Sequence, residues 1–247
     1  MQGASFPLRL SHEDLMARQA RDARPGRTYH LVQRGHDRAE IFRDDQDRSS
    51  YFDSFLQAAI GFGLRVHAYC LLKSEAHWLV TPQRADAMAD VVQQVGRSYV
   101  RRFNTRWMRQ GTLWEGRYRA YWIDEPVFGL LVQRAIEWLP VRATLVNHPA
   151  DWTWSSAQIH CGRRPETRLM PLPSYWALGN TPFEREASYP SILDQALTDS
   201  TWECVKKGLS SGRPWATERT MASLPAEEQA RWQKRPRGRP RVLSKVA

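Results

Sequence analysis

The sequence predicts an α+β fold in which helices pack on a largely antiparallel sheet of the split-βαβ, ferredoxin-like kind. Strand-like and helix-like segments alternate as β-α-β-β-α-β-α over residues 28–146, and two consecutive strands lie close enough to form a hairpin. With 247 residues, 42% of them hydrophobic and 25% charged, the chain is long enough and apolar enough to bury a core.

The first half of this pattern predicts three strands and one helix. Residues 28–33 alternate like a strand, and residues 47–62 place apolar side chains at helical spacing before two glycines end the helix. Residues 64–72 and 77–81 read as two strands joined around residues 73–75. The short connection predicts that these two strands form a hairpin.

The second half adds a long amphipathic helix over residues 84–107 and a strand in the later part of residues 111–123. Asp124 is placed to cap a helix that runs to about Trp138, and a short helix is expected to end near Val146. Proline-rich sequence and two helical patterns, at about 183–208 and 217–232, follow. The predicted organisation is an N-terminal arm (1–26), a ferredoxin-type domain (27–160), a helical C-terminal region (161–232) and a basic tail (233–247).

Positive charge is concentrated in two short blocks. The chain has a net charge of +10, of which residues 231–247 contribute +7 and residues 97–119 contribute +6, so that the remainder is slightly acidic. Seven arginines supply the positive charge of the second block. Two separate basic blocks favour a phosphate-backbone partner over a merely solvated surface.

Several classes of protein are excluded by composition. The three cysteines form no CxxC pair and cannot all pair with one another, which argues against a disulfide scaffold and a zinc finger. No apolar run approaches the length of about 18 residues that a membrane span needs, and no hydrophobic signal region is present. We therefore expect a cytoplasmic, nucleoid-associated protein with no membrane partner.

Three segments resemble a known family. The sequences YHLVQRGHDR (29–38), VHAYCLLKSEAHWLVTP (66–82) and GTLWEGRY…IEWLPVRATLV…ADWTWSS (111–156) are similar to the single-tyrosine HUH transposases. The REP-associated tyrosine transposases of bacteria are the subgroup they resemble, and the resemblance extends collinearly over roughly residues 17–242. It implies the ferredoxin-like fold already predicted and a DNA partner with palindromic or hairpin structure.

In that family a His-hydrophobic-His motif on a central strand holds a divalent metal that polarises the scissile phosphate. The motif matches residues 73–77 here, so that Glu75 replaces the first histidine and His77 remains. Because carboxylates ligate Mg²⁺ and Mn²⁺, the resemblance leaves Glu75 and His77 as candidate metal ligands, with Lys73 placed to pair with Glu75. The alternative is that Glu75 and Lys73 are surface residues of the hairpin turn and His77 a half-buried strand residue.

The family's nucleophile is a tyrosine that becomes covalently joined to DNA. The family motif Arg-Tyr-Ile-Glu-Leu-Asn-Pro-Val-Arg-Ala matches residues 134–143, which puts Ala135 at the nucleophile's position. Alanine has no nucleophilic atom. Tyr99, Tyr118 and Tyr121 are the nearest tyrosines, and we expect all three to pack rather than to react. The resemblance therefore implies no catalytic residue.

The arginine-rich helix and the Trp-Glu-Gly-Arg segment after it are where the resemblance places DNA binding. Arginine forks bind phosphates and guanine edges, and Trp107, Trp114 and Trp122 are candidates for stacking on unpaired bases. The candidate DNA-binding residues of this part are Arg34, Arg97, Arg101, Arg102, Arg106, Arg109, Trp114, Arg117, Arg119 and Arg142.

The terminal sequence KRPRGRPR contains the Arg-Gly-Arg-Pro core of an AT-hook. Its glycine permits close approach to the groove floor, and its arginines suit the narrow minor groove of A·T-rich DNA. The candidate residues of the tail are Arg235, Arg237, Gly238, Arg239 and Arg241.

We therefore expect a DNA-binding relative of these transposases that lacks strand cleavage, with recruitment to transcription regulation as a hypothesis. The expected partner is palindromic or hairpin DNA with an A·T-rich flank, bound by a monomer or homodimer, and the only cofactor considered is Mg²⁺ or Mn²⁺. Three alternatives stay open: a metal-dependent endonuclease that uses Tyr118 or Tyr121, a binder of structured RNA, and the product of a decaying gene.

Overall fold

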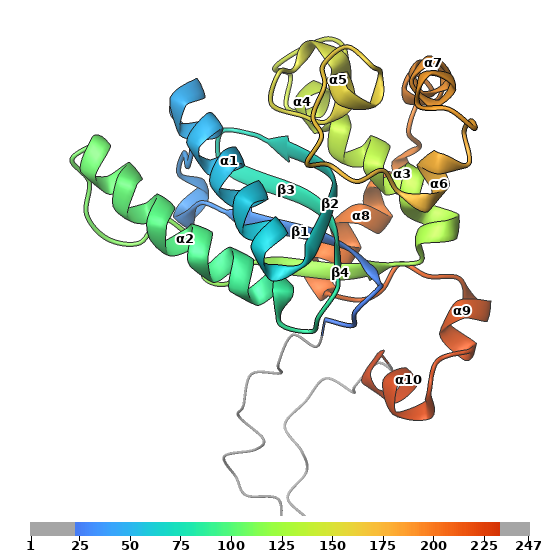
Figure 1. The fold of residues 1–247 in the computed structure, drawn as a ribbon. Helices are drawn as coiled ribbons and strands as arrows, with labels where there is room; N and C mark the ends of the chain where they lie inside the picture. The colour runs from blue at the N-terminus through green and yellow to red at the C-terminus, as the bar shows by residue number, and fades with distance from the viewer. Residues whose placement is uncertain (1–22, 233–247) are drawn as a thin grey trace, which may run out of the picture.

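A computed structural model describes residues 23–232 and confirms the predicted fold class. Its centre is a four-stranded, wholly antiparallel sheet in the order β2-β3-β1-β4 (Figure 1). The strands are β1 (Thr28–Arg34), β2 (Leu64–Leu71), β3 (Glu75–Pro82) and β4 (Arg119–Ile123). All four strands were predicted, but Glu75 is the first residue of β3 rather than part of the turn.

The register of the sheet decides which side chains share a face. Val32 on β1 and Cys70 on β2 are both opposite His77 on β3, and His30 is opposite Leu79. Because successive side chains of a strand alternate between faces, His30 and His77 point to the same side of the sheet. This side is the one covered by the C-terminal half of the chain.

The other side of the sheet is covered by α1 (Asp45–Phe62) and α2 (Ala87–Arg106) (Figure 1). The Asp44 side chain accepts a hydrogen bond from the Asp47 amide at 3.0 Å and so caps α1. Gly63, in the left-handed conformation with a φ of 69°, ends this helix. The indole of Trp78 on β3 is fully buried and stacks on Phe55 of α1, with the two rings 3.7 Å apart.

The second face of the sheet is covered by α3 (Glu125–Glu137) and α8 (Asp199–Ser211). Asp124 stands at the predicted start of α3, but its side chain does not cap that helix. Its carboxylate instead accepts hydrogen bonds from the hydroxyls of Thr217 and Thr220, which attaches the following C-terminal segment to the end of β4.

Sequence reasoning was wrong about the long helix over 183–208. Two helices, α7 (Pro182–Leu193) and α8, occupy this range, because the Thr198 side chain accepts from the Thr201 amide at 3.2 Å and starts a new helix. The remaining elements are η1 (His36–Arg38), α4 (Leu139–Arg142), η2 (Pro149–Asp151), α5 (Ala157–His160), α6 (Pro173–Trp176), α9 (Glu218–Ala222) and α10 (Ala226–Trp232).

The C-terminal helices share one core with the sheet. Tyr189 of α7 and Trp202 of α8 are buried in the same cluster as Val32 and Leu79 of the strands. At the other end of the chain, the Gly26 amide donates to the Pro82 carbonyl at 2.8 Å, so the last residues of the predicted N-terminal arm are part of the folded domain. Within residues 23–232, every helix is too short or too polar to cross a bilayer.

His67 of β2 predicts a loss of stability in acid. Its ring is 4% exposed and hydrogen-bonded to the Met170 carbonyl at 2.6 Å and the Thr81 hydroxyl at 2.8 Å. Burial lowers its pKa from 6.5 to about 4, although the Met170 contact opposes this shift. Below pH 6.5 the unfolded chain therefore takes up a proton that the folded protein excludes, and stability falls until the pH reaches about 4.

We expect this group to remove about 3 kcal/mol of the free energy of unfolding across that window. Urea unfolding, measured at several pH values, should show a smaller acid-dependent loss in His67→Gln than in the wild type. His36→Gln changes an exposed histidine and is the matched control. Equal pH dependence in the wild type and in His67→Gln would show that this group does not contribute.

Candidate nucleic-acid interface

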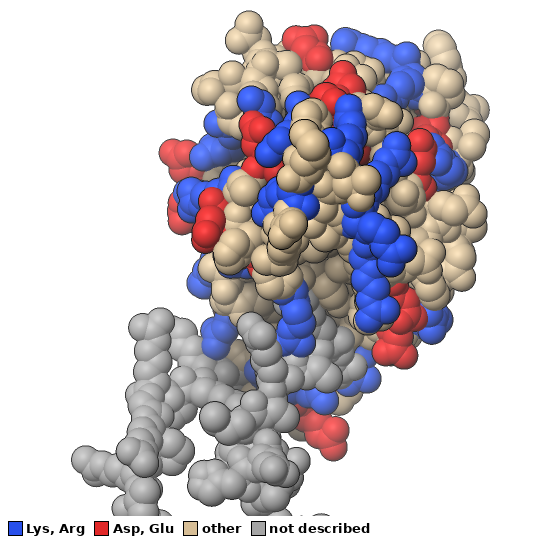
Figure 2. All heavy atoms as spheres, turned by 90° about the vertical axis from the view of Figure 1, so that its left-hand side faces the viewer, with Lys and Arg blue, Asp and Glu red and all other residues tan. Residues whose placement is uncertain are grey.

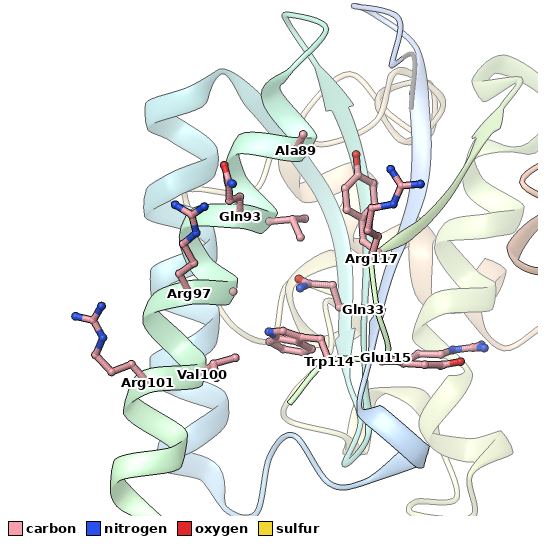
Figure 3. A pocket seen from close by; sticks show the side chains of 14 residues that line it. Gln33, Ala89, Gln93, Arg97, Val100, Arg101, Trp114, Glu115 and Arg117 are labelled. Carbon is pink, nitrogen blue, oxygen red and sulfur yellow. The ribbon is translucent and has the colours of Figure 1, made fainter. Parts of the chain in front are cut away.

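A groove of about 700 Å³ lies between α2 and the segment that leads from α2 into β4 (Figure 3). One wall of the groove is a stripe of α2. Ala89, Gln93, Arg97 and Arg101 follow one another at intervals of four residues, which places them on the same face of the helix. The helical period therefore brings two of the predicted arginines to this groove.

The opposite wall is formed by the end of β1 and residues 114–118. Backbone hydrogen bonds attach this segment to β1, since the Glu115 amide donates to the Arg34 carbonyl at 2.8 Å and the His36 amide donates to the Leu113 carbonyl at 2.9 Å. Gly116 has a φ of +63°, a conformation that side chains rarely adopt, at the turn preceding Arg117. The wall thus brings Arg117 opposite α2. The Arg34 backbone also lines the groove, but its side chain follows His30 and Val32 to the other face of the sheet, where Nε lies 3.0 Å from Glu75 Oε1.

The floor of the groove is apolar and fixed by packing. Trp114 is half-buried, and its ring lies 6.0 Å from the rings of both Tyr51 and Tyr99. The Tyr51 hydroxyl donates to Gln33 Oε1 at 2.5 Å, which holds the amide of Gln33 at the groove. A flat aromatic ring and an oriented amide are suited to stacking on a base and hydrogen-bonding to its edge.

The rim of the groove carries unpaired positive charge. Arg97, Arg101 and Arg117 are exposed, and none forms a hydrogen bond or ion pair with any residue of the described range. Figure 3 shows the side chains of Arg97 and Arg101 extending outward from α2, away from the cavity. On the same side of the molecule, Lys and Arg side chains are spread widely with acidic ones between them (Figure 2). Free guanidinium groups above an apolar floor are suited to phosphates flanking a bound base.

The structure gives other partners to several of the predicted arginines. Arg102 is exposed on α2 but does not line the groove. The others are engaged within the protein: Arg106 with Asp44 at 2.7 Å and Asp47 at 2.6 Å, Arg109 with the Thr112 carbonyl at 2.8 Å, Arg119 with Glu115 at 3.1 Å, and Arg142 over the ring of Trp202 at 4.3 Å.

The three tryptophans proposed for stacking are also separated by the structure. Trp107 donates to Asp47 at 3.0 Å, and the guanidinium groups of Arg43 and Arg106 lie 4.9 and 4.8 Å from its ring centroid. Trp122 is 7% exposed beneath Arg27. Of the three, Trp114 lines the groove.

The position of the predicted metal ligands is occupied by a chain of hydrogen bonds. His77 Nε2 lies 2.8 Å from Glu75 Oε2, and His77 Nδ1 lies 3.0 Å from His30 Nε2. The Tyr121 hydroxyl lies 3.2 Å from His30 Nδ1 and completes the chain. The ionised Glu75 only accepts, so His77 Nε2 donates to it, and each of the other two contacts pairs one donor with one acceptor in the fitting tautomer of His30.

Burial and neighbouring charges shift the pKa values of His30 and Glu75 in this hydrogen-bonded chain. Burial first, and then the nearby positive charges of His77 and Arg34, hold the pKa of His30 well below 6.5. For Glu75, burial raises the pKa, but the hydrogen bond from His77 and the positive charges of His77, Arg34 and Arg38 outweigh it and bring the pKa to about 2. Glu75 is therefore ionised at neutral pH.

These residues do not fit a divalent metal. Both nitrogens of His77 and both oxygens of Glu75 already have protein partners, the second oxygen pairing with Arg34 Nε at 3.0 Å. No group of three metal-ligating side chains is placed to hold an ion in residues 23–232. Two expectations were also wrong: Lys73 lies 3.7 Å from Glu40 instead of pairing with Glu75, and His77 is fully buried.

Ala135 is on α3 and only 1% exposed, with its methyl group packed in the core beneath the sheet. The three candidate tyrosines are buried, as expected. Tyr99 donates to the Ile41 carbonyl at 2.6 Å, Tyr118 is 8% exposed, and Tyr121 is 1% exposed. Burial raises the pKa of Tyr121, which disfavours its phenolate form.

Sequence reasoning missed the two amides of the groove, Gln33 and Gln93, and the role of His30. Gln93 follows from the same four-residue spacing as the arginines and could have been found. Gln33 and His30 depend on the register between β1 and its neighbours, for which the sequence carries no direct signal. The candidate AT-hook residues, Arg235, Arg237, Gly238, Arg239 and Arg241, lie outside the described residues.

Comparison with known proteins finds that residues 25–129 match the family of IS200-like transposases. A solved structure described as a REP-associated tyrosine transposase bound to a REP hairpin is 15% identical, with 64% of this chain and 93% of that chain covered and a TM-score of 0.48. A candidate transposase from Deinococcus radiodurans R1 is 21% identical, with 48% and 95% covered and a TM-score of 0.34. The sequence matches none of the curated proteins.

Proposed function

Because residues 25–129 match the family of IS200-like transposases, we propose that the protein binds DNA in the groove beside α2 without cleaving it. The observation that carries the proposal is the placement of Arg97, Arg101 and Arg117 on the rim of the groove above the half-buried Trp114. These residues come from two separate segments of the chain, and only the fold brings the two segments together.

The form of the groove favours DNA that offers both backbone and unpaired bases. The cations at the rim suit phosphates, and the apolar floor suits a base that has left its stack. A palindromic hairpin with a single-stranded flank has both features. The family resemblance points to the same substrate class, with repetitive extragenic palindromes as the specific proposal and the basic tail as a second contact to A·T-rich flanks.

Three observations support the absence of cleavage. The nucleophile's position is the buried methyl group of Ala135, the metal-ligand position is saturated by internal hydrogen bonds, and the candidate tyrosines are buried. Tyr121 is the nearest hydroxyl to the histidine chain, but attack by it requires DNA to enter the core between β4 and α8, where its ring contacts Gly208.

The test combines binding with covalent trapping. We expect purified protein to retard a labelled DNA hairpin with a single-stranded 5′ extension in a native gel, yet to give no adduct on a denaturing gel after incubation with Mn²⁺. A covalent adduct would contradict the proposal. The variants Tyr118→Phe and Tyr121→Phe would then identify the nucleophile.

Two further experiments test whether the partner is DNA or RNA and what the biological role of binding is. Competition by an RNA hairpin of the same sequence distinguishes a DNA-specific site from one that reads hairpin shape. Genome-wide mapping of bound DNA tests the proposed biological role, because palindromic intergenic repeats indicate retained ancestral recognition, whereas a small set of promoters indicates a regulator.

A further inference from the structure

We infer that the groove selects an unpaired keto base, guanine or thymine, through the side-chain amide of Gln33. This amide offers the groove a hydrogen-bond donor and no acceptor, because its oxygen is engaged inside the protein by Tyr51. Tyr51 is therefore the positioning residue of the site. The inference rests on the proposed DNA-binding function and adds to it the class of base that the groove selects.

The side chain of Gln33 lies on the face of the sheet that forms the groove. Leu31, two residues earlier on β1, packs in the core beneath α1 and α2, and the side chains of a strand return to the same face at every second residue. The hydrogen bond from Tyr51 of α1 agrees with this direction. Figure 3 shows Gln33 extending from the sheet toward α2, close to Trp114.

The two polar atoms of the Gln33 amide have different surroundings. Oε1 accepts a hydrogen bond from the Tyr51 hydroxyl at 2.5 Å. Nε2 has no hydrogen-bond partner among residues 23–232, yet it is not sealed from solvent, although the residue as a whole is only 4% exposed. Because Gln33 lines the groove, this free N–H opens into it. A ligand that brings an acceptor to the groove therefore supplies the partner that the protein does not.

Tyr51 fixes which end of the amide faces the groove. Its side chain is fully buried, and the rings of Phe42 and Tyr99 lie 5.1 and 5.0 Å from its own. Its hydroxyl donates to one acceptor among residues 23–232, the oxygen of Gln33. A flipped amide would leave this buried hydroxyl proton without an acceptor, which costs free energy. The donor end of Gln33 is therefore the end that a ligand meets.

A fixed donor distinguishes keto bases from amino bases. Glutamine reads adenine with both ends of its amide, but the oxygen of Gln33 is not available for that pairing. The corresponding edges of guanine and thymine present acceptors and no donor, namely O6 and N7 in guanine and O4 in thymine. On adenine and cytosine, the exocyclic amino group would place a second donor against Nε2. The ring of Trp114 supplies a stacking surface in the same groove.

The experiment compares DNA hairpins that differ only in their unpaired bases. Every unpaired position, in the loop and in single-stranded extensions at both ends, carries uracil or cytosine in one pair of hairpins and hypoxanthine or adenine in the other. Within each pair, a carbonyl oxygen on the same ring system is exchanged for an amino group. Fluorescence anisotropy with the full chain should show about fivefold tighter binding of the uracil and hypoxanthine hairpins, as expected of one hydrogen bond.

Variants assign this preference to the amide, measured at about pH 8, where glutamate is ionised. Gln33→Met should abolish the preference. Gln33→Glu keeps an acceptor for Tyr51 and replaces the free N–H by an oxygen, so it should reverse the preference even though its charge weakens binding of every hairpin. Tyr51→Phe frees the amide to flip and should remove most of the preference. Gln94→Met is the matched control, since Gln94 is exposed on α2 outside the groove, and it should keep the wild-type preference.

Equal binding of both members of each pair by the wild type would overturn the inference. A preference for cytosine and adenine, a keto preference that survives in Gln33→Met, or its loss in Gln94→Met would overturn it as well. If Tyr51→Phe fails to fold, the two Gln33 variants still decide. If the wild type binds none of the hairpins, the proposed function itself fails, which is a different outcome from binding without a preference.

Discussion

Replacement of Glu137 by alanine is expected to destabilise the protein by about 3 to 5 kcal/mol, the largest effect of any single polar substitution considered. Glu137 ends α3 and is fully buried. Its carboxylate accepts from Ser156 at 2.7 Å, His160 at 2.6 Å and Tyr189 at 2.6 Å, which connects α3 to α5 and α7. Alanine leaves the buried donors of His160 and Tyr189 without this acceptor and leaves the Ser156 hydroxyl only the Tyr69 carbonyl at 3.4 Å, and each unsatisfied buried donor costs free energy.

Urea unfolding followed by tryptophan fluorescence measures this effect. Glu137→Gln keeps the volume but turns one acceptor into a donor, so we expect a smaller loss than for alanine. Glu203→Gln is the control, because Glu203 is exposed and, among residues 23–232, forms an ion pair with Lys206 alone, at 2.8 Å, an interaction worth less than about 1 kcal/mol. A loss below about 1 kcal/mol for Glu137→Ala would show that the network does not hold the C-terminal helices on the sheet.

Combined replacement of Arg97, Arg101 and Arg117 by glutamine is expected to reduce affinity for hairpin DNA by on the order of a hundredfold at physiological salt. These side chains have no partner among the described residues, so their removal breaks no internal contact that the structure shows. If each arginine neutralises one phosphate, the log–log salt dependence should fall by about three units. Thermal unfolding should change little.

The matched control removes the same charge from the opposite face of the sheet. Arg163, Lys206 and Lys207 lie on or beside α5 and α8 and outside the groove. Their joint replacement by glutamine lowers the net charge equally, so any loss that both variants share reflects net charge alone. Equal losses in the two variants would show that the groove is not the binding site.

Much of the fold could be predicted because it depends on local pattern. Period-two and helical spacing located all four strands, α1, α2 and α3, and turn residues limited their ends. The prediction of one helix over 183–208 was wrong. Its apolar spacing continues across Thr198, so the pattern gave no sign of the hydrogen bond to the Thr198 side chain that starts a second helix.

The residues of the candidate site could be predicted from the sequence, but not which of them form ion pairs within the protein. Sequence identified the arginines of α2, and the four-residue spacing of Arg97 and Arg101 did put them together. The sequence did not show that Arg106, on the same helix, is paired within the protein, because its partners Asp44 and Asp47 are about sixty residues away in the chain. Long-range ion pairs leave no signal in the spacing of either segment, so that free and paired arginines look alike in sequence.

The sequence by itself determined the class of fold and the concentration of positive charge in residues 97–119 and the tail, since these follow from residue identity and local period. Tertiary structure alone decided which arginines remain free, that Trp114 lines a groove, and that Glu75 pairs with Arg34 and His77. Those outcomes depend on strand register and helix packing, which bring together residues far apart in the chain, and side chains select partners by proximity only after the core has formed.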